Sequence, residues 1–183
     1  MASVLVPLAQ GCEELEAVTV IDLLRRAGIE VVTAGLDNQP VRASRGTVLI
    51  PDVTLDEAVG RKYDMVVLPG GLPGADFLDK DPRIHGLLKE MADADRYTAA
   101  ICAAPRVLAG AGLLAGRRAT SFPGALQAFE GFSYREEAVV QDGKVITSRG
   151  PGTAMDFALV LIENLVGKEK RDEVESGLQR SGT

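Results

Sequence analysis

The chain alternates short apolar runs with longer segments in which apolar residues recur every three or four positions. Short apolar runs of this kind predict buried strands, at residues 4–8, 29–34 and 65–68. The helical spacing predicts amphipathic helices, over residues 13–27, 82–93 and 154–166. Strands that alternate with helices in this way predict a mostly parallel sheet with helices on both faces.

A hairpin signal stands near the C-terminal end of this pattern. The pair Asp142-Gly143 separates two β-like runs, residues 139–141 and 144–146, and Asp-Gly is a strong two-residue hairpin turn. We therefore expect an α/β three-layer sandwich with a small antiparallel hairpin. No linker or repeat divides the chain, so we expect one domain over residues 1–183, with a final helix in the charged tail and fraying over residues 180–183.

Composition and charge narrow the class of protein. The formal net charge is −6 at pH 7, and without a basic block this argues against a sequence-specific nucleic-acid partner. The N-terminal segment has no cationic region of a signal peptide, and no run reaches the roughly 18 apolar residues of a membrane span. We expect a cytoplasmic protein without a membrane partner. Its 2 cysteines do not form a disulfide framework, and both should be free thiols there.

The segment TAAICAAP, residues 98–105, predicts a sharp strand-to-helix turn with Cys102 at its tip. Such an elbow strains the backbone, so the positions two before and two after the nucleophile must be small, and here they are Ala100 and Ala104. Pro105 suits the first turn of the following helix. A thiol at a helix N-terminus tends towards thiolate. A buried structural cysteine is the alternative, because a free cysteine behaves as a small hydrophobe.

Two groups could support a reactive Cys102. The backbone N–H groups of Gly71 and Ala103 would form a plausible oxyanion hole, although Pro-Gly-Gly can also simply turn the chain after a strand. Glu16, in a half-buried site beside the thiol, could keep its proton and act as a general acid and base. The alternative is a helix-capping role, which we expect of its neighbours Glu13 and Glu14.

Other candidate chemistry is poorly supported. His85 is the sole histidine, and it lies beside the apolar stripe of its helix, where a solvated position is expected. A Cys-His-Asp triad would need an imidazole base near the thiol. The usual His or multi-Cys ligands of a catalytic metal site are also missing. Cys12 follows the first strand and could approach the same edge of the sheet, where we expect it to be a non-catalytic thiol.

Four segments together resemble the ThiJ/PfpI superfamily: EELE at residues 13–16, VLPGG at 67–71, AAICAAP at 99–105 and TSRGPGT at 147–153. The chain looks closest to the branch of the parkinsonism-associated protein deglycase and its bacterial YajL-like relatives. The similarity covers nearly the whole chain, in the same order and spacing. Four motifs in one order are far more specific than any one of them.

The resemblance implies a flavodoxin-like fold, a homodimer and no cofactor or metal. It implies that Cys102 is the nucleophile and an oxidation-sensitive thiol, with Glu16 as its protonated partner. The family's amide donors fall on Gly71 and Ala103. Arg45 matches a family arginine near the dimer interface and the site.

The same resemblance implies that the Gly150-Pro151 turn lies near the cysteine pocket. One departure concerns histidine, which some members carry directly after the cysteine or in a later His-Pro pair. Here those positions are Ala103 and Phe122. The peptidase function of the PfpI branch therefore lacks its base, whereas the YajL-like group is similar to this chain in having phenylalanine.

Two functions follow as hypotheses. The first is a cysteine-dependent, cofactor-free enzyme, a glyoxalase III-type hydro-lyase or protein deglycase. It would act on methylglyoxal-type dicarbonyls or on their early protein and nucleotide adducts, and so protect against carbonyl and oxidative stress. The second is a redox-sensing protein or chaperone switched by oxidation of Cys102. An esterase or amidase is a third, weakly supported hypothesis because no base is evident.

Overall fold

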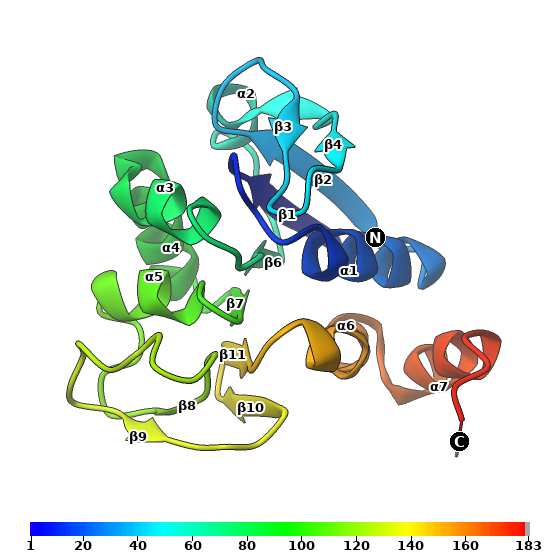
Figure 1. Ribbon diagram of the computed structural model, residues 1–183. Helices are drawn as coiled ribbons and strands as arrows, with labels where there is room; N and C mark the ends of the chain where they lie inside the picture. The colour runs from blue at the N-terminus through cyan, green and yellow to red at the C-terminus, as the bar shows by residue number, and fades with distance from the viewer. Residues whose placement is uncertain (182–183) are drawn as a thin grey trace.

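A seven-stranded sheet forms the centre of the computed structural model, which describes residues 1–181. The strand order is β10-β11-β7-β6-β1-β2-β5, and every neighbouring pair is parallel except β10 and β11 (Figure 1). The strands are β1 (Ser3–Leu8), β2 (Glu30–Gly35), β5 (Val53–Thr54), β6 (Met65–Leu68), β7 (Tyr97–Ile101), β10 (Val139–Asp142) and β11 (Val145–Ser148). The predicted mostly parallel sheet with one antiparallel hairpin is confirmed.

Helices cover both faces of this sheet. One apolar layer lies under α1 (Glu14–Arg26) and α6 (Ala154–Val166), and α7 (Lys168–Gly177) packs against α6. The other layer lies under α2 (Leu55–Ala58), α3 (Gly74–Lys80), α4 (Pro82–Asp93) and α5 (Pro105–Gly110). Figure 1 shows the two groups of helices on opposite sides of the strands. The fold is therefore the expected flavodoxin-like three-layer sandwich.

The C-terminal tail differs in part from its prediction. The final helix is present as α7, but Arg180, which we expected to be frayed, forms ion pairs with Asp156 at 2.8 Å and Glu175 at 3.3 Å. The rest of the fraying prediction includes residues 182–183, which lie outside the described residues.

Several short elements were not predicted from the sequence. A hairpin of β3 (Val41–Arg42) and β4 (Val48–Leu49) lies beside the start of α1, and β8 (Arg118–Ala119) pairs with β9 (Ser133–Tyr134). A short 3-10 helix, η1 (Pro151–Thr153), precedes α6. Strands of two residues are too short for a hydrophobic period to be recognised.

The order of the strands brings the chemically interesting segments together. Strands β1, β6 and β7 are consecutive neighbours in a parallel sheet, so their carboxyl ends lie at one edge. The Glu13 N–H donates to the Gly70 carbonyl at 2.9 Å, which joins the first two of these strand ends. The expectation that the segments after β1, β6 and β7 converge is confirmed.

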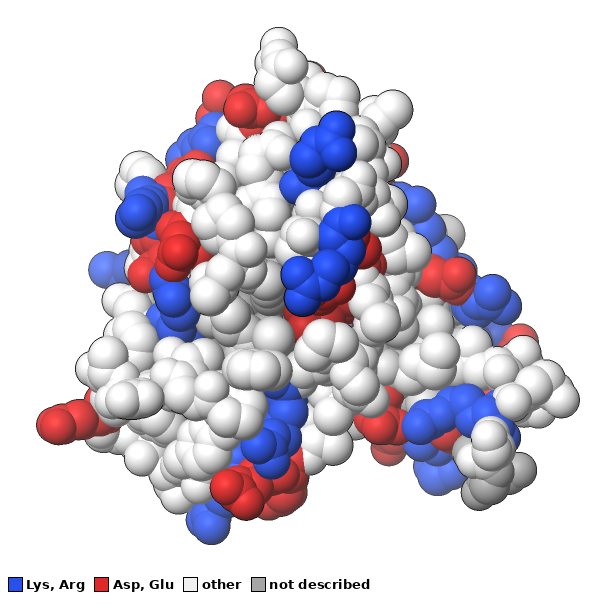
Figure 2. All heavy atoms as spheres, in the orientation of Figure 1, with Lys and Arg blue, Asp and Glu red and all other residues white. Residues whose placement is uncertain are grey.

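The charged side chains of the protein do not gather by sign on the face shown in Figure 2. On the face shown in Figure 2, basic and acidic side chains alternate in small groups. Proteins that bind a nucleic-acid backbone commonly carry a clustered basic patch or stripe instead. Within the described part of the chain, no helix is both long enough and apolar enough to cross a membrane.

Candidate active site

Cys102 lies directly after β7 in a left-handed backbone conformation, with φ of +65°. This conformation costs roughly 1–2 kcal/mol for a residue with a Cβ. Two main-chain hydrogen bonds hold the residue there: its N–H donates to the Ser148 carbonyl at 2.9 Å, and its carbonyl accepts the Phe122 N–H at 2.8 Å. Ala100 and Ala104 are fully buried on either side. The predicted strained elbow is confirmed, with 9% of Cys102 still exposed.

Glu16 comes from the first turn of α1 and is completely buried. Its carboxyl group shares a hydrogen bond with the Cys102 thiol, and Oε2 also accepts the Gly70 N–H at 2.8 Å. Oε1 has no nitrogen or oxygen partner within residues 1–181. The structure therefore brings Glu16 and Cys102 together, as the sequence analysis expected.

The two groups influence each other's proton affinity. Burial raises the pKa of Glu16 to about 7, although the Gly70 N–H and the Cys102 thiol oppose this shift. Burial and the charge of Glu16 raise the pKa of the Cys102 thiol to about 12, against the lowering effect of the Gly71 and Ala103 N–H groups. The expected lowered thiol pKa is therefore wrong while Glu16 is ionised. Desolvation and a neighbouring negative charge outweigh the start of the short helix α5.

A protonated Glu16 changes this balance. The negative charge beside sulfur then disappears, and the carboxyl O–H becomes a donor to the thiolate. Cys102 and Glu16 thus form a coupled pair that shares one proton. Nucleophilic sulfur at this site requires that Glu16 holds that proton.

Glycines make room for the pair. The N–H groups of Gly71 and Ala103 both hydrogen-bond to the Cys102 sulfur, so the two predicted donors converge on it. A Cβ at Gly71, where φ is +88°, would lie 2.4 Å from the Glu13 nitrogen. A Cβ at Gly70 would lie 2.7 Å from the Cys102 Cβ and 2.8 Å from Glu16 Oε2. The doubled glycine predicted a close approach at this turn, but not the bond from the Gly70 N–H to Glu16.

The neighbouring glutamates have different roles. Glu13 caps α1, as expected, because its side chain accepts the Leu15 N–H at 3.3 Å. Glu14 was also expected to cap the helix, and its carboxylate does accept its own N–H at the helix start. Its carboxylate accepts the N–H groups of Arg45 at 3.0 Å and Thr47 at 3.3 Å, so it holds the β3–β4 turn against the helix start. The unpredicted hairpin supplied donors that the sequence did not reveal.

Arg45 and the Gly150-Pro151 turn border this region. Arg45 is exposed on the β3–β4 turn, with its main chain bound to the first turn of the helix that carries Glu16. Gly150 follows β11, whose Ser148 carbonyl holds Cys102, and Pro151 begins η1. A Cβ at Gly150 would lie 3.4 Å from Cδ2 of Phe122, so the ring rests on this glycine. The sequence analysis gave Phe122 no role.

His85 and Cys12 are not part of the pair. The His85 Nε2 contacts the Asp79 carbonyl at 2.8 Å and Oδ1 at 3.0 Å. Cys12 is 1% exposed, and burial together with the charge of Glu14 raises the pKa of its thiol to about 12. Across residues 1–181, no group of three or more His, Cys, Asp or Glu side chains is placed to hold a metal ion.

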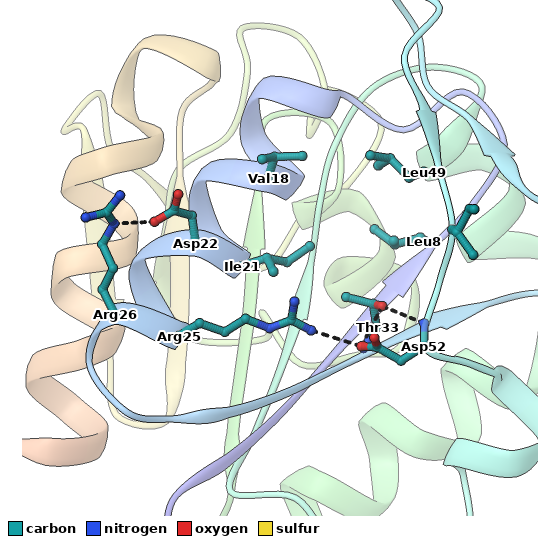
Figure 3. Close-up of a pocket in the computed structure, with 10 residues that line it drawn as sticks. Leu8, Val18, Ile21, Asp22, Arg25, Arg26, Thr33, Leu49 and Asp52 are labelled. Atoms are coloured by element: carbon teal, nitrogen blue, oxygen red, sulfur yellow. Dashed lines mark hydrogen bonds and ion pairs between the residues drawn. The ribbon is translucent and has the colours of Figure 1, made fainter.

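A separate hollow of about 490 Å³ lies between α1 and the segment after β4. Figure 3 shows Val18, Ile21 and Leu49 around it, with an ion pair of 3.0 Å between Arg25 and Asp52 at one end. Neither Cys102 nor Glu16 lines this hollow. It belongs to the outer surface of α1 and not to the thiol site.

Comparison with known proteins gives consistent matches. The sequence model of the DJ-1/PfpI family matches residues 2–164. Protein dj-1beta of Drosophila melanogaster is 46% identical over 179 residues, which is 96% of each chain, and its crystal structure superposes with a TM-score of 0.94 over 97% of both chains. A Caenorhabditis elegans protein named glutathione-independent glyoxalase DJR-1.2 is 37% identical over 174 residues, 94% of this chain and 92% of its own. Toxoplasma gondii DJ-1, in a structure described as oxidized, superposes with a TM-score of 0.95 at 38% identity, covering 99% of this chain and 100% of its own.

Proposed function

This chain belongs to the DJ-1/PfpI family, and on that premise we propose that it is a cysteine-dependent, cofactor-free glyoxalase or deglycase. Its substrates would be methylglyoxal-type dicarbonyls or their early adducts with proteins and nucleotides. The name of the glyoxalase relative supports this reaction class. The observation that carries the proposal is the buried, hydrogen-bonded pair of Glu16 and Cys102, with two backbone N–H donors at the sulfur.

In the first step, the Cys102 thiolate attacks the aldehyde carbon of methylglyoxal and forms a hemithioacetal. The N–H groups of Gly71 and Ala103, which bond to the sulfur of the free protein, would donate to the oxyanion that forms on the carbon attached to it. Glu16 gives its proton to the new alkoxide. Its Oε1, without a nitrogen or oxygen partner among the described residues, is free to accept a proton from the substrate.

In the second step, the ionised Glu16 takes the hydrogen from the former aldehyde carbon and returns a proton to the neighbouring carbon through an enediol. This leaves a lactoyl thioester on Cys102, which water hydrolyses to lactate and the free thiol. The sum is methylglyoxal plus water to lactate, with no net oxidation or reduction. A group whose pKa is about 7 suits this alternation of acid and base.

The test is lactate formation from methylglyoxal by the wild type, Cys102→Ala and Glu16→Ala. We expect no turnover without Cys102 and a loss of about 10²–10⁴-fold without Glu16, the usual size of general acid–base effects. Cys12→Ala is the matched thiol control and should keep wild-type turnover. Full activity in Cys102→Ala or Glu16→Ala would contradict the mechanism, provided that circular dichroism shows both variants folded.

A redox role for Cys102 is the second candidate. Cys102 keeps 9% of its surface exposed, and the donors around its sulfur could bind the oxygens of a sulfinate formed by two equivalents of peroxide, each releasing water. Intact mass after mild peroxide tests this role. A gain of two oxygens at Cys102 without any dicarbonyl turnover would favour sensing over catalysis.

We further propose that the protein forms a homodimer through the outer face of α1 and the β3–β4 hairpin. Large apolar side chains are exposed there: Leu15, Val18, Val48 and Ile50, the last with 83% of its surface exposed. Two of them, Val18 and Ile50, line the hollow of Figure 3, and contiguous exposed apolar surface marks interaction sites. Sedimentation equilibrium should give a dimer for the wild type and a weaker dimer for Ile50→Glu.

A further inference from the structure

We infer that Phe122 and Leu72 form an apolar rim on the two sides of Cys102, and that Phe122 selects dicarbonyls with an apolar substituent. This inference rests on the proposed function and deepens it. It names the chemical class of substrate, an aryl or alkyl 2-oxoaldehyde in preference to the unsubstituted dialdehyde glyoxal.

The topology places the segments that carry Leu72 and support Phe122 on opposite sides of β7, the strand that ends before Cys102. Strand β7, which ends before Cys102, lies between β6 and β11 in the sheet. The segment after β6 carries Gly71 and then Leu72, and the Gly71 N–H reaches the sulfur. The segment after β11 carries Gly150, on which the Phe122 ring rests. Leu72 therefore follows the strand on one side of Cys102. Phe122, from the segment after β8, packs against the segment that follows the strand on the other side.

Phe122 is held firmly although half of it is exposed. Its N–H donates to the Cys102 carbonyl at 2.8 Å, so it is bound to the main chain of the proposed nucleophile itself. The ring lies 3.4 Å from the Cβ position of Gly150. It nevertheless keeps 50% of its surface exposed, and Leu72 keeps 57%. An apolar group of a ligand that covers this exposed surface would be stabilised by the hydrophobic effect.

The polar groups of the site are concentrated around sulfur. The Gly71 and Ala103 N–H groups and the Glu16 carboxyl surround it, whereas Phe122 and Leu72 carry no polar side-chain atom. A ligand that matches both the polar groups and the apolar side chains has a dicarbonyl group at one end and an apolar substituent at the other. Phenylalanine cannot exchange a proton, so Phe122 can act on the substituent but not as an acid or a base.

The experiment compares kcat/KM for phenylglyoxal, methylglyoxal and glyoxal. Covering one methyl group is worth about four-fold, and a pocket that distinguishes such groups reaches roughly 10–200-fold. We expect Phe122→Ala to lower the phenylglyoxal-to-glyoxal ratio by about ten-fold, whereas the intrinsic reactivity of the aldehydes cancels in the comparison with the wild type. Val166→Ala, at the far end of α6, is the matched control and should leave the ratio unchanged.

A second pair of variants covers the case in which Phe122→Ala does not fold. The side chains of Phe122→Leu and Phe122→Asn have the same number of heavy atoms, branched at the same carbon, and differ in polarity. We expect the leucine variant to keep most of the selectivity and the asparagine variant to lose it. Equal ratios in these two variants and in the wild type would overturn the inference.

A readout without turnover separates this inference from the proposed function. The rates at which N-phenylmaleimide and N-methylmaleimide modify Cys102 are measured, with the site confirmed by peptide mass. We expect the phenyl-to-methyl rate ratio to fall several-fold in Phe122→Ala. If no dicarbonyl is turned over but this ratio falls, the proposed function fails and the apolar rim stands. If dicarbonyls are turned over and both ratios stay unchanged, the rim fails alone.

Discussion

Cys12 and Cys102 follow strands β1 and β7 at the same edge of the sheet, and both have a thiol pKa raised to about 12. Burial is the largest cause for each. Cys12 belongs to the apolar layer under α1, with 1% of its surface exposed, and only its own backbone hydrogen bond favours its thiolate. Cys102 is more exposed and has a strained backbone conformation. Its sulfur also contacts N–H donors of two other residues and the carboxyl group of Glu16.

Burial and a raised thiol pKa are common to both cysteines, so these two properties do not separate a structural thiol from a reactive one. The two cysteines differ in the groups that surround the sulfur when the thiol loses its proton. Around Cys102 there is a second group, Glu16, that can keep the proton and donate it back. Around Cys12 the nearby carboxylates act through space and only oppose ionisation.

Alkylation rates should show the largest contrast between the two thiols. With iodoacetamide at pH 7.5, we expect Cys102 to react at least about 100-fold faster than Cys12, because thiolate character and access both favour it. Peptide mass spectrometry after timed quenching measures both rates in one sample. Comparable rates at the two cysteines would show that Cys102 is no more reactive than the structural thiol of Cys12.

The pH profile of Cys102 alkylation sharpens this test. Below pH 7 both groups of the pair are protonated, and loss of the first proton, with an apparent pKa of about 7, creates the reactive shared-proton state. The rate should therefore rise with pH up to about 7 and then level off. In Glu16→Gln the inflection near 7 should disappear, while Glu163→Gln, on an exposed position of α6, should retain it.

Stability should depend on pH through Glu16 and not through Cys12. The fold raises the pKa of Glu16 from 4.5 to about 7, so its stabilising contribution is complete below pH 4.5 and is lost as the pH rises through 7. Glu16→Gln should therefore gain up to about 3 kcal/mol over the wild type between pH 4.5 and pH 8. Urea unfolding at several pH values measures this difference.

Cys12→Ala provides the counterpart for stability. Because the Cys12 thiol has a pKa of about 12 in the fold against 9.0 ordinarily, it is protonated in both states over this pH range. Its stability difference from the wild type should stay constant between pH 4.5 and pH 8. A constant difference for Glu16→Gln as well would show that the carboxyl group titrates normally in the fold.

Three glycines give the smallest expected effects. A Cβ added at Gly70 would lie 2.7 Å from the Cys102 Cβ, and one added at Gly74 would lie 2.7 Å from the Cys12 Cα and nitrogen. A Cβ at Gly86, in α4, would meet open space. Alanine at Gly70 or Gly74 should cost about 1–3 kcal/mol through overpacking. Alanine at Gly86 should stabilise the helix by about 1 kcal/mol. Only Gly70→Ala should also slow Cys102 alkylation, and thermal unfolding with labelling rates distinguishes the three.

The sheet and the main helices were predictable because their apolar periods are long and regular. The helix over Pro82–Asp93 and the helix over Ala154–Val166 have the predicted bounds, and the Asp142-Gly143 turn joins β10 to β11. Parallel topology then made the strand ends converge, so the elbow, the glutamate and the glycine turn could be placed together. These features are local patterns combined with one general rule of open sheets.

The rest depended on contacts between distant segments. The pKa of Cys102 follows from burial and from Glu16, neither of which is visible in the residues around the elbow. Glu14 was expected only to cap its helix, but it also binds the turn at Arg45, and the two-residue strands beside that turn leave no period to detect. The link of Phe122 to the Cys102 carbonyl likewise joins segments whose pairing no local pattern reveals.

The peptide units on both sides of Cys102 are fastened, one to Ser148 and the other to Phe122. This double attachment has a consequence for damage and repair. Chemistry on the side chain can add atoms or remove them while the surrounding polypeptide keeps its course. The modified and unmodified proteins should thus share one shape, so a reductase or a partner would have to distinguish them by the sulfur group alone.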